Sequence, residues 1–229
     1  MPRARTSQND RQTAASPQEQ GSGCLSGFTI VPLSVILISY LLASLALKTN
    51  PAPSVNSEMP PAASTGISPI FTPEIQYWAG NIIQWAAASQ LDPNLAATIM
   101  QIESCGDPRA RSSAGAMGLF QVMPFHFYTA DNPYDPDTNA ARGLDYLLRS
   151  LNAGGGDARL AMAGYNGGIG IISRAEWAWS AQTKRYIQYG VPIYQDARNG
   201  LSVSNAVTEW YEKYGASLCR QAHERLGLP

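Results

Sequence analysis

The sequence predicts a mainly α-helical domain over residues 73–229, with one transmembrane helix ahead of it. Apolar residues recur at helical spacing through the C-terminal part of the chain, and Thr-Pro and Asp-Pro pairs mark helix starts. A capping side chain followed by proline at the first helical position is a typical helix start. Apart from a short hairpin near 111–123, no alternating strand pair is expected.

The N-terminal segment predicts a tail followed by a membrane anchor. Residues 1–27 are polar and rich in Ser, Gln and Arg, which is typical of a disordered tail. Residues 28–47 contain no charged side chain, and a helix of that length spans a bilayer's hydrocarbon core of about 30 Å. The alternative is a cleaved signal peptide, but its apolar region is usually about 7–15 residues long and ends in a small-x-small site. We therefore expect an uncleaved anchor.

Charge and proline content predict how the anchor and the domain are arranged. Arg3, Arg5 and Arg11 precede the apolar run, so the tail is expected to stay in the cytoplasm. The rest of the chain would then lie on the outer side of the cytoplasmic membrane, periplasmic or extracellular. Residues 48–72 are rich in proline, alanine and serine and are expected to form an extended linker.

Helix starts in the C-terminal domain are marked by capping residues. Gly106 is expected to end the second helix, and the last helix is expected to run to Leu226. The expected starts are Thr72-Pro73, Asp92-Pro93, Asp135-Pro136, Asp157 and Ser204.

Composition argues against two classes of partner. The formal net charge is −1, whereas nucleic-acid binding needs a basic face. The chain has three cysteines with no CxxC pair, and its two histidines lie far apart in sequence. No zinc cluster is expected.

Glu103 is the candidate acid/base. It lies at the end of the second expected helix, with Met100 and Ile99 on the preceding turn. Apolar neighbours desolvate a carboxyl group and raise its pKa, as a general acid working near neutral pH requires. By itself this signal is weak, because a single glutamate near a helix end is usually a solvated surface residue.

Three ordered blocks strengthen the interpretation. They are ESCGDPRARSSAGAMGLFQVMP at 103–124, AMAGYNGG at 161–168 and QTKRYI at 182–187. Together they resemble the lytic transglycosylases, whose catalytic domain is lysozyme-like, over roughly residues 75 to 205. The departures from that family's pattern are Phe120 for the usual Met, Gly164 for Ala and Gln182 for Glu. Three blocks in order are far more specific than one short motif.

The resemblance implies cleavage of the β-1,4 bond between N-acetylmuramic acid and N-acetylglucosamine in peptidoglycan. Glu103 would protonate the glycosidic oxygen and the sugar's 2-acetamido group would stabilise the anomeric carbon. Glu103 would then accept the proton of the muramic 6-hydroxyl, which closes a 1,6-anhydro ring. The mechanism that the resemblance implies needs no metal and no organic cofactor. The implied substrate-binding residues are Ser112, Gln121, Tyr165, Asn166 and Tyr186. On general grounds the same residues are also common as turn, surface or core residues.

Two alternatives remain open at this point. One is a goose-type muramidase, which would hydrolyse the same bond; the other is a peptidoglycan-binding module without turnover. A muramidase would give reducing ends instead of 1,6-anhydro ends. If the chain is an enzyme, Glu103→Gln should abolish lysis and leave binding intact, whereas a binding module shows no lysis to lose.

Cys105 and Cys219 are expected to form a disulfide. They are the two cysteines on the predicted outer side of the membrane, where thiols tend to be oxidised, whereas Cys24 lies on the other side. The alternative is that both are small buried residues, since their separation in space cannot be obtained from the sequence.

Overall fold

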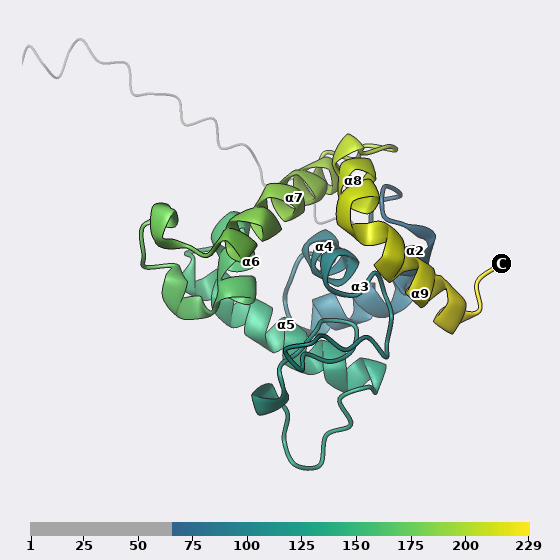
Figure 1. The fold of residues 1–229 in the computed structure, drawn as a ribbon, viewed down its shortest axis with the longest axis horizontal. Helices are drawn as coiled ribbons and strands as arrows, with labels where there is room; N and C mark the ends of the chain where they lie inside the picture. The colour runs from purple at the N-terminus through teal and green to yellow at the C-terminus, as the bar shows by residue number, and fades with distance from the viewer. Residues whose placement is uncertain (1–65) are drawn as a thin grey trace, which may run out of the picture. The chain divides into compact units, whose positions relative to one another are not determined.

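The computed structural model describes residues 66–229, which form a mainly helical domain (Figure 1). Extended backbone pairing in this part of the chain is limited to the isolated bridges Arg111–Met117 and Met117–Val122, where a short hairpin was expected. The α-helices are α2 (Pro73–Tyr77), α3 (Ala79–Ala88), α4 (Pro93–Glu103), α5 (Pro136–Ala153), α6 (Ala158–Gly167), α7 (Ala181–Arg198), α8 (Asn205–Trp210) and α9 (Ala216–Leu226). Shorter turns are the 3-10 helices η1 (Pro124–His126), η2 (Ile169–Ile171) and η3 (Glu176–Ala178) and the π-helix η4 (Tyr211–Gly215).

Capping side chains start four of the helices at the predicted residues. Asp92, Asp135, Asp157 and Ser204 each accept a hydrogen bond from a backbone N–H in the first turn of α4, α5, α6 and α8. Each bond satisfies a donor that the helix itself leaves unpaired. Thr72 occupies the N-cap position of α2 but makes no side-chain cap bond. The predicted helix starts are therefore confirmed, although α2 begins without the capping hydrogen bond expected from Thr72.

Helix α4 is the centre of the domain. Every residue from Asn94 to Gln101 is buried, and α4 contacts α2, α3 and α7. Figure 1 shows α4 nearly end-on, with the other helices around it. Burial of the whole circumference explains why its central residues are so apolar, since each buried aliphatic side chain contributes about 1.5–3 kcal/mol.

Helix α7 was not anticipated from the sequence. Gly190 and Pro192 interrupt its pattern, and proline inside a helix removes one backbone hydrogen bond. Packing outweighs this cost, because α7 lies against both α4 and α6. A Cβ at Gly190 would come within 3.0 Å of Met162 Sδ and 3.1 Å of Ile102 Cδ1, so the missing side chain permits the close approach.

The domain begins earlier than the predicted boundary at residue 73. Ile70 and Phe71 are buried in the core, the Ser68 N–H donates to Asn94 Oδ1 (2.7 Å), and the Thr72 N–H donates to Gln101 Oε1 (3.1 Å). The last part of the predicted 48–72 linker is thus part of the folded domain. Its two large apolar residues drive this packing, because burial removes them from water.

The predicted membrane anchor at 28–47 and the tail at 1–27 lie outside the described residues. Within 66–229, no helix combines the length and the apolarity needed to cross a bilayer.

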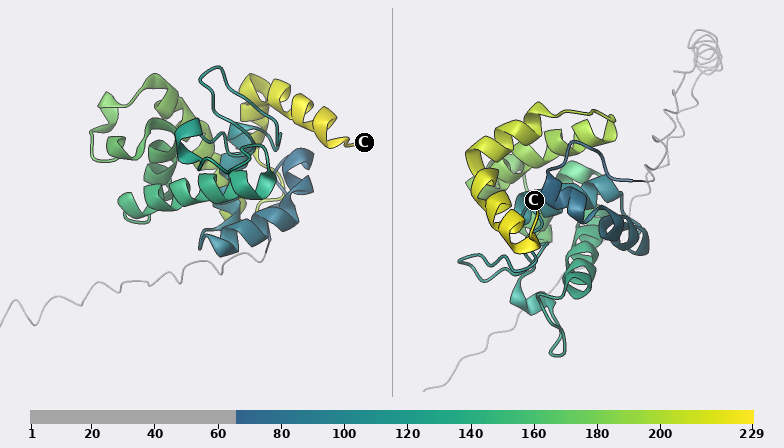
Figure 2. Two further views of the ribbon diagram at one scale, coloured as in Figure 1. Left: turned by 90° about the horizontal axis from the view of Figure 1, so that it is seen from below. Right: turned by 90° about the vertical axis from the view of Figure 1, so that its right-hand side faces the viewer.

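A disulfide joins Cys105 and Cys219, as the sequence analysis expected, with a Cα–Cα distance of 5.0 Å. It connects the residue two positions after Glu103 to helix α9. Figure 2 shows α9 passing beside the N-terminal helices, and α9 contacts α2. The C-terminal helix is therefore fixed next to the end of α4.

Candidate active site

Glu103 is the last residue of α4 and lines a hollow in the surface. The residue is only partly exposed, and burial raises the pKa of its carboxyl from 4.5 to about 7. Desolvation has this effect because it disfavours the charged form. A carboxyl group with such a pKa exists in both protonation states near neutral pH and can act as a general acid and then as a base.

Tyr186, on α7, is the polar partner of Glu103. Its hydroxyl lowers the pKa of Glu103 by hydrogen bonding, an effect smaller than that of burial. Among the described residues, however, no group meets strict hydrogen-bond geometry with this buried hydroxyl. The contact between the Tyr186 hydroxyl and the Glu103 carboxyl is therefore long or poorly aligned, as is common for catalytic hydrogen bonds before substrate binds. Burial and the nearby carboxylate raise the pKa of Tyr186 well above its usual value, so the hydroxyl stays protonated.

Three side chains hold the loop of residues 117–121, which contains Gln121. The Ser104 hydroxyl donates to the Leu119 carbonyl (2.6 Å), and the Tyr165 hydroxyl donates to the Phe120 carbonyl (2.7 Å). Asn139, on α5, accepts from the Phe120 N–H (2.9 Å) and donates to the Met117 carbonyl (2.8 Å). Because these bonds come from α5, from α6 and from the residue that follows α4, the loop is fixed before any ligand arrives.

Gly118 is required in this loop for two reasons. Its φ is +74°, and a Cβ would lie 2.3 Å from Asn139 Nδ2; any other side chain would collide with the amide that holds the loop. Gln121 also has a positive φ, of 45°, and its Nε2 donates to the Gly118 carbonyl (3.0 Å). The Oε1 of Gln121 remains available to a ligand.

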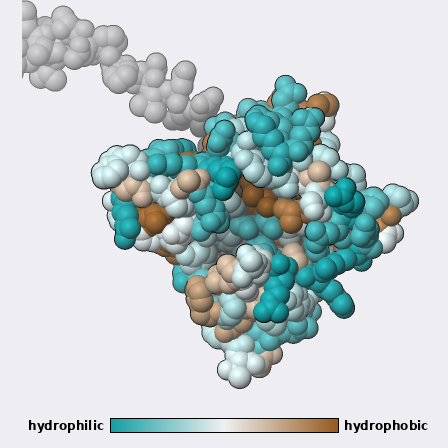
Figure 3. Space-filling view, in the orientation of Figure 1, coloured by the Kyte–Doolittle hydropathy of each residue, from teal (hydrophilic) through white to brown (hydrophobic). Residues whose placement is uncertain are grey.

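Two hollows meet at Asn166. The first has a volume of about 210 Å³ and contains Glu103; the second has about 170 Å³ and contains Gln121 and Tyr165. Asn166 lines both. Figure 3 shows a recess near the middle of the face, floored by apolar residues and edged by hydrophilic ones. A chain-like ligand can therefore extend to both sides of Asn166.

Thr183 orients Asn166. The Thr183 hydroxyl donates to Asn166 Oδ1 (3.1 Å) and also contacts the Ser180 hydroxyl (2.9 Å). Because the amide oxygen is occupied, the NH₂ group of Asn166 is the end left to face a ligand. Thr183 belongs to the third sequence block but was not identified as a site residue.

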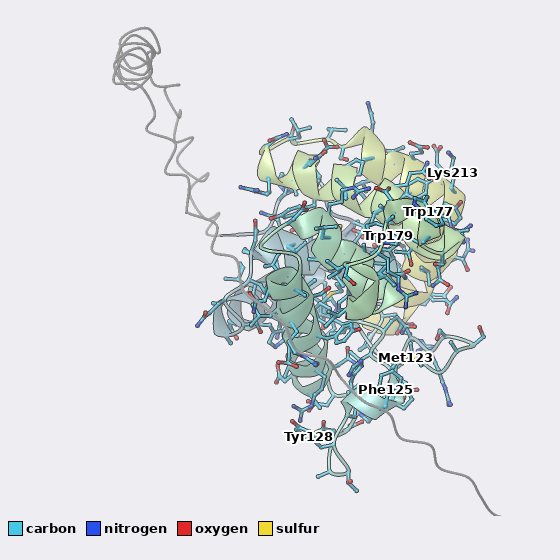
Figure 4. The ribbon with its side chains drawn as sticks, turned by 90° about the vertical axis from the view of Figure 1, so that its left-hand side faces the viewer. Met123, Phe125, Tyr128, Trp177, Trp179 and Lys213 are labelled. Atoms are coloured by element: carbon cyan, nitrogen blue, oxygen red, sulfur yellow. A yellow bond between two sulfur atoms is a disulfide. The ribbon has the colours of Figure 1, made fainter. Side chains whose placement is uncertain are left out.

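A series of aromatic rings lines the second hollow. Tyr165 and Tyr146 have ring centroids 5.7 Å apart, Tyr146 and His126 4.5 Å, and His126 and Phe125 4.5 Å. Phe125, which Figure 4 labels beside Met123 near η1, is 74% exposed. Exposed aromatic faces of this kind suit the apolar faces of sugar rings. Burial lowers the pKa of His126, which favours its neutral form.

The aspartates near Glu103 in sequence are engaged elsewhere. Asp107 contacts Arg225 (3.3 Å), Asp131 pairs with Arg142 (2.7 Å), and Asp137 accepts from Trp85 Nε1 (2.7 Å). Asp135 caps α5. Glu103 is the one carboxylic acid among the described residues that line the two hollows.

One further cluster offers metal-ligand atom types. Glu74, Cys105 and Cys219 place a carboxylate and two sulfur atoms within 4.8 Å of one another. The two sulfur atoms are bonded to each other, and a metal thiolate site needs free thiolates. The cluster therefore does not fit a metal, and Glu74 pairs instead with His223 (3.0 Å).

The structure brings together five of the six predicted site residues. Glu103 and Tyr186 line one hollow, Gln121 and Tyr165 line the other, and Asn166 lines both. The sixth, Ser112, lines neither; its hydroxyl accepts from the Ala116 N–H (3.0 Å) and holds a tight turn. Sequence reasoning missed several lining residues: Arg185, which lies within the third block, and six that lie outside the three blocks, Phe125, His126, Tyr146, Tyr189, Trp210 and Tyr214.

Comparison with known proteins finds a family match in the central part of the chain. Residues 80–188 match the model of the family described as "Transglycosylase SLT domain". A protein named "Transglycosylase" from Enterobacteria phage PRD1 is 38% identical over 114 residues, which cover 49% of this chain and 40% of the phage protein. The chain thus spans less than half the length of that relative.

A solved structure is also similar. It is an inactive variant of the lytic transglycosylase Slt from Pseudomonas aeruginosa, with 24% sequence identity and a TM-score of 0.44 over 58% of this chain and 26% of that chain.

Proposed function

We propose that this chain is a peptidoglycan lytic transglycosylase with Glu103 as its sole acid/base, and the match of residues 80–188 to the transglycosylase SLT domain family supports this. The observation that supports this most directly is a partly buried glutamic acid with a pKa of about 7 in a cleft whose described lining contains no second carboxylic acid. Glycosidases that use two carboxylates need the second one within about 5–9.5 Å of the first. A single carboxyl must instead serve first as acid and then as base.

In the proposed reaction, protonated Glu103 donates its proton to the glycosidic oxygen between N-acetylmuramic acid and N-acetylglucosamine. The C1–O bond breaks, and the 2-acetamido oxygen of the muramic residue stabilises the electron-poor anomeric carbon. Carboxylate Glu103 then accepts the proton of the 6-hydroxyl as its oxygen bonds to C1. The product is a 1,6-anhydro end, and Glu103 returns to its protonated state.

The fixed polar groups of the cleft support this reaction. Tyr186 stabilises the carboxylate form of Glu103, which lowers the cost of the first proton transfer. Asn166 lines both hollows, which supports a role in holding the sugar at the scissile bond. Gln121 belongs to a loop that is already held by hydrogen bonds, one of them from the Tyr165 hydroxyl on α6, so little ordering is needed on binding.

The test is product analysis with the purified protein and isolated sacculi. Mass spectrometry is expected to show 1,6-anhydro-muramic ends, whereas reducing muramic ends would identify a hydrolase and refute the transglycosylase assignment. Glu103→Gln is expected to bind sacculi but release no muropeptides. If this variant lysed sacculi at the wild-type rate, Glu103 would not be the acid/base.

We also propose that the catalytic domain lies outside the cytoplasmic membrane, anchored by residues 28–47. The uncharged run and the basic flank support this, and the Cys105–Cys219 disulfide suits an oxidising compartment. Protease added to spheroplasts is expected to degrade the domain; full protection in intact spheroplasts would contradict the orientation.

A further inference from the structure

Part of the hollow that contains Glu103 is built by chain beyond the matched domain. Tyr189, Trp210, Tyr214 and Leu218 line it, and all four follow residue 188, where the family match ends. They form an aromatic and aliphatic wall beside the acid/base. The C-terminal helices therefore contribute to the ligand site as well as to the core.

Two features set the position of this wall. The π-helix η4 interrupts the run from α8 to α9, and a Cβ at Gly215 would lie 2.5 Å from the Trp210 ring; only glycine allows the ring this position. The disulfide then fixes Cys219, the residue after Leu218. A π-turn in a helix is often found at a functional site, and here it carries Tyr214 into the hollow.

Arg185 lies at the rim of the same hollow and is exposed. Its guanidinium carbon is 5.7 Å from the centroid of the Tyr214 ring, which positions the charge. Across residues 66–229 no carboxylate lies within 4.0 Å of this guanidinium. Lys213, which Figure 4 labels, is by contrast paired with Glu209 at 2.6 Å. Arg185 is thus a positioned cation without an acidic partner.

Gln182 explains why Arg185 is unpaired. The two residues lie three positions apart on α7, and both line the hollow. Oppositely charged residues at that spacing pair on a helix surface, so a glutamate at 182 would neutralise Arg185. The neutral amide present here leaves the guanidinium for a ligand.

We propose that Arg185 is a specificity-determining residue that binds the free carboxylate of the second stem residue on the muramic acid next to the cleaved bond. This rests on the proposed function, since it assumes a peptidoglycan substrate. The glycan backbone carries no charge on its N-acetylated sugars, so the anionic groups of that substrate are on its peptide stems. Arginine suits such a partner because its planar fork matches a carboxylate, and the apolar wall beside it suits the short aliphatic side chains of a stem.

The test compares two uncross-linked glycan strands that differ only in the second stem residue, D-isoglutamate or its neutral amide D-isoglutamine. Wild-type protein is expected to cleave the acidic strands with a kcat/KM up to about fivefold higher, the upper end of the effect of one exposed ion pair. Arg185→Gln is expected to abolish the preference, and Gln182→Glu to reduce it by pairing with Arg185. Arg220→Gln, an exposed position on α9 outside the hollow, is the matched control and is expected to keep it.

The ratio of the two kcat/KM values separates recognition from folding, because a loss of folded protein lowers both equally. Equal cleavage of the two strands by the wild type, or a preference that persists in Arg185→Gln, overturns the proposal and leaves the proposed function standing. If the wild type cleaves neither strand, the proposed function itself fails, and the inference fails with it.

Discussion

Replacement of Glu103 by glutamine is expected to stabilise the protein at alkaline pH while it abolishes activity. Burial raises the pKa of Glu103 from 4.5 to about 7, so the folded state binds this proton more tightly than the unfolded state does. Above pH 7 the native protein must hold a desolvated carboxylate. Glutamine has nearly the same shape and carries no charge at any pH.

The sign and the size of this pH-dependent change in unfolding free energy follow from the linkage between proton binding and folding. With the folded pKa raised, the unfolding free energy is highest below pH 4.5 and falls as the pH rises to 7. A rise in the pKa of Glu103 from 4.5 to about 7 corresponds to a loss of about 3 kcal/mol in unfolding free energy. Glu103→Gln should not lose this contribution. Compared with the wild type, the variant should therefore gain up to about 3 kcal/mol between about pH 4 and about pH 8.5.

The assay is equilibrium unfolding in denaturant at those two pH values, followed by circular dichroism with the disulfide intact. The difference in unfolding free energy between variant and wild type is compared at the two pH values, so the contributions of the other titrating groups cancel. Glu212→Gln, at an exposed position on η4, is the matched control and should show no such gain. A stability difference between Glu103→Gln and wild type that is the same at both pH values would refute the desolvation argument.

Two other changes test the surroundings of Glu103. Tyr186→Phe removes the hydroxyl that lowers the pKa of Glu103, so the alkaline limb of the pH–activity profile should move to higher pH by roughly 0.4–1 unit, the size of one hydrogen bond; an unchanged or lowered limb would contradict the assignment. Reduction of the Cys105–Cys219 disulfide, which closes a loop with a sequence separation of 114, should lower the unfolding free energy by about 4–5 kcal/mol in the chain-entropy model. This is measured by denaturant titration with and without reductant, and equal midpoints would show that the bond contributes nothing.

Sequence patterns predicted the helices best where the signal was local. The caps at Asp92, Asp135 and Asp157 bond to N–H groups two or three residues away, so neighbours in sequence are enough to recognise them. Helix α7 was missed because Gly190 and Pro192 have poor helix propensity. Its stability comes from packing against α4 and α6, which no local window contains.

The site residues also divide into those that a sequence block identified and those that only the structure revealed. The three sequence blocks identified Glu103, Gln121, Tyr165, Asn166 and Tyr186, and the structure gathers all five around two adjoining hollows. The expected role of Ser112 in substrate binding stays a prediction, since the structure places its hydroxyl in a turn. Residues without a motif were found only in three dimensions.

The sequence by itself determined that a glutamic acid ends an apolar helix, where the following helices begin, and which two cysteines were available to pair. The tertiary structure decided how strongly Glu103 holds its proton, because desolvation depends on every group that packs around the carboxyl. It also decided that Asn139 fixes the loop across 19 residues of chain and that Trp210 and Tyr214 form one wall of the site. Such contacts join distant segments through close packing, and packing depends on shape and volume in three dimensions rather than on residue order.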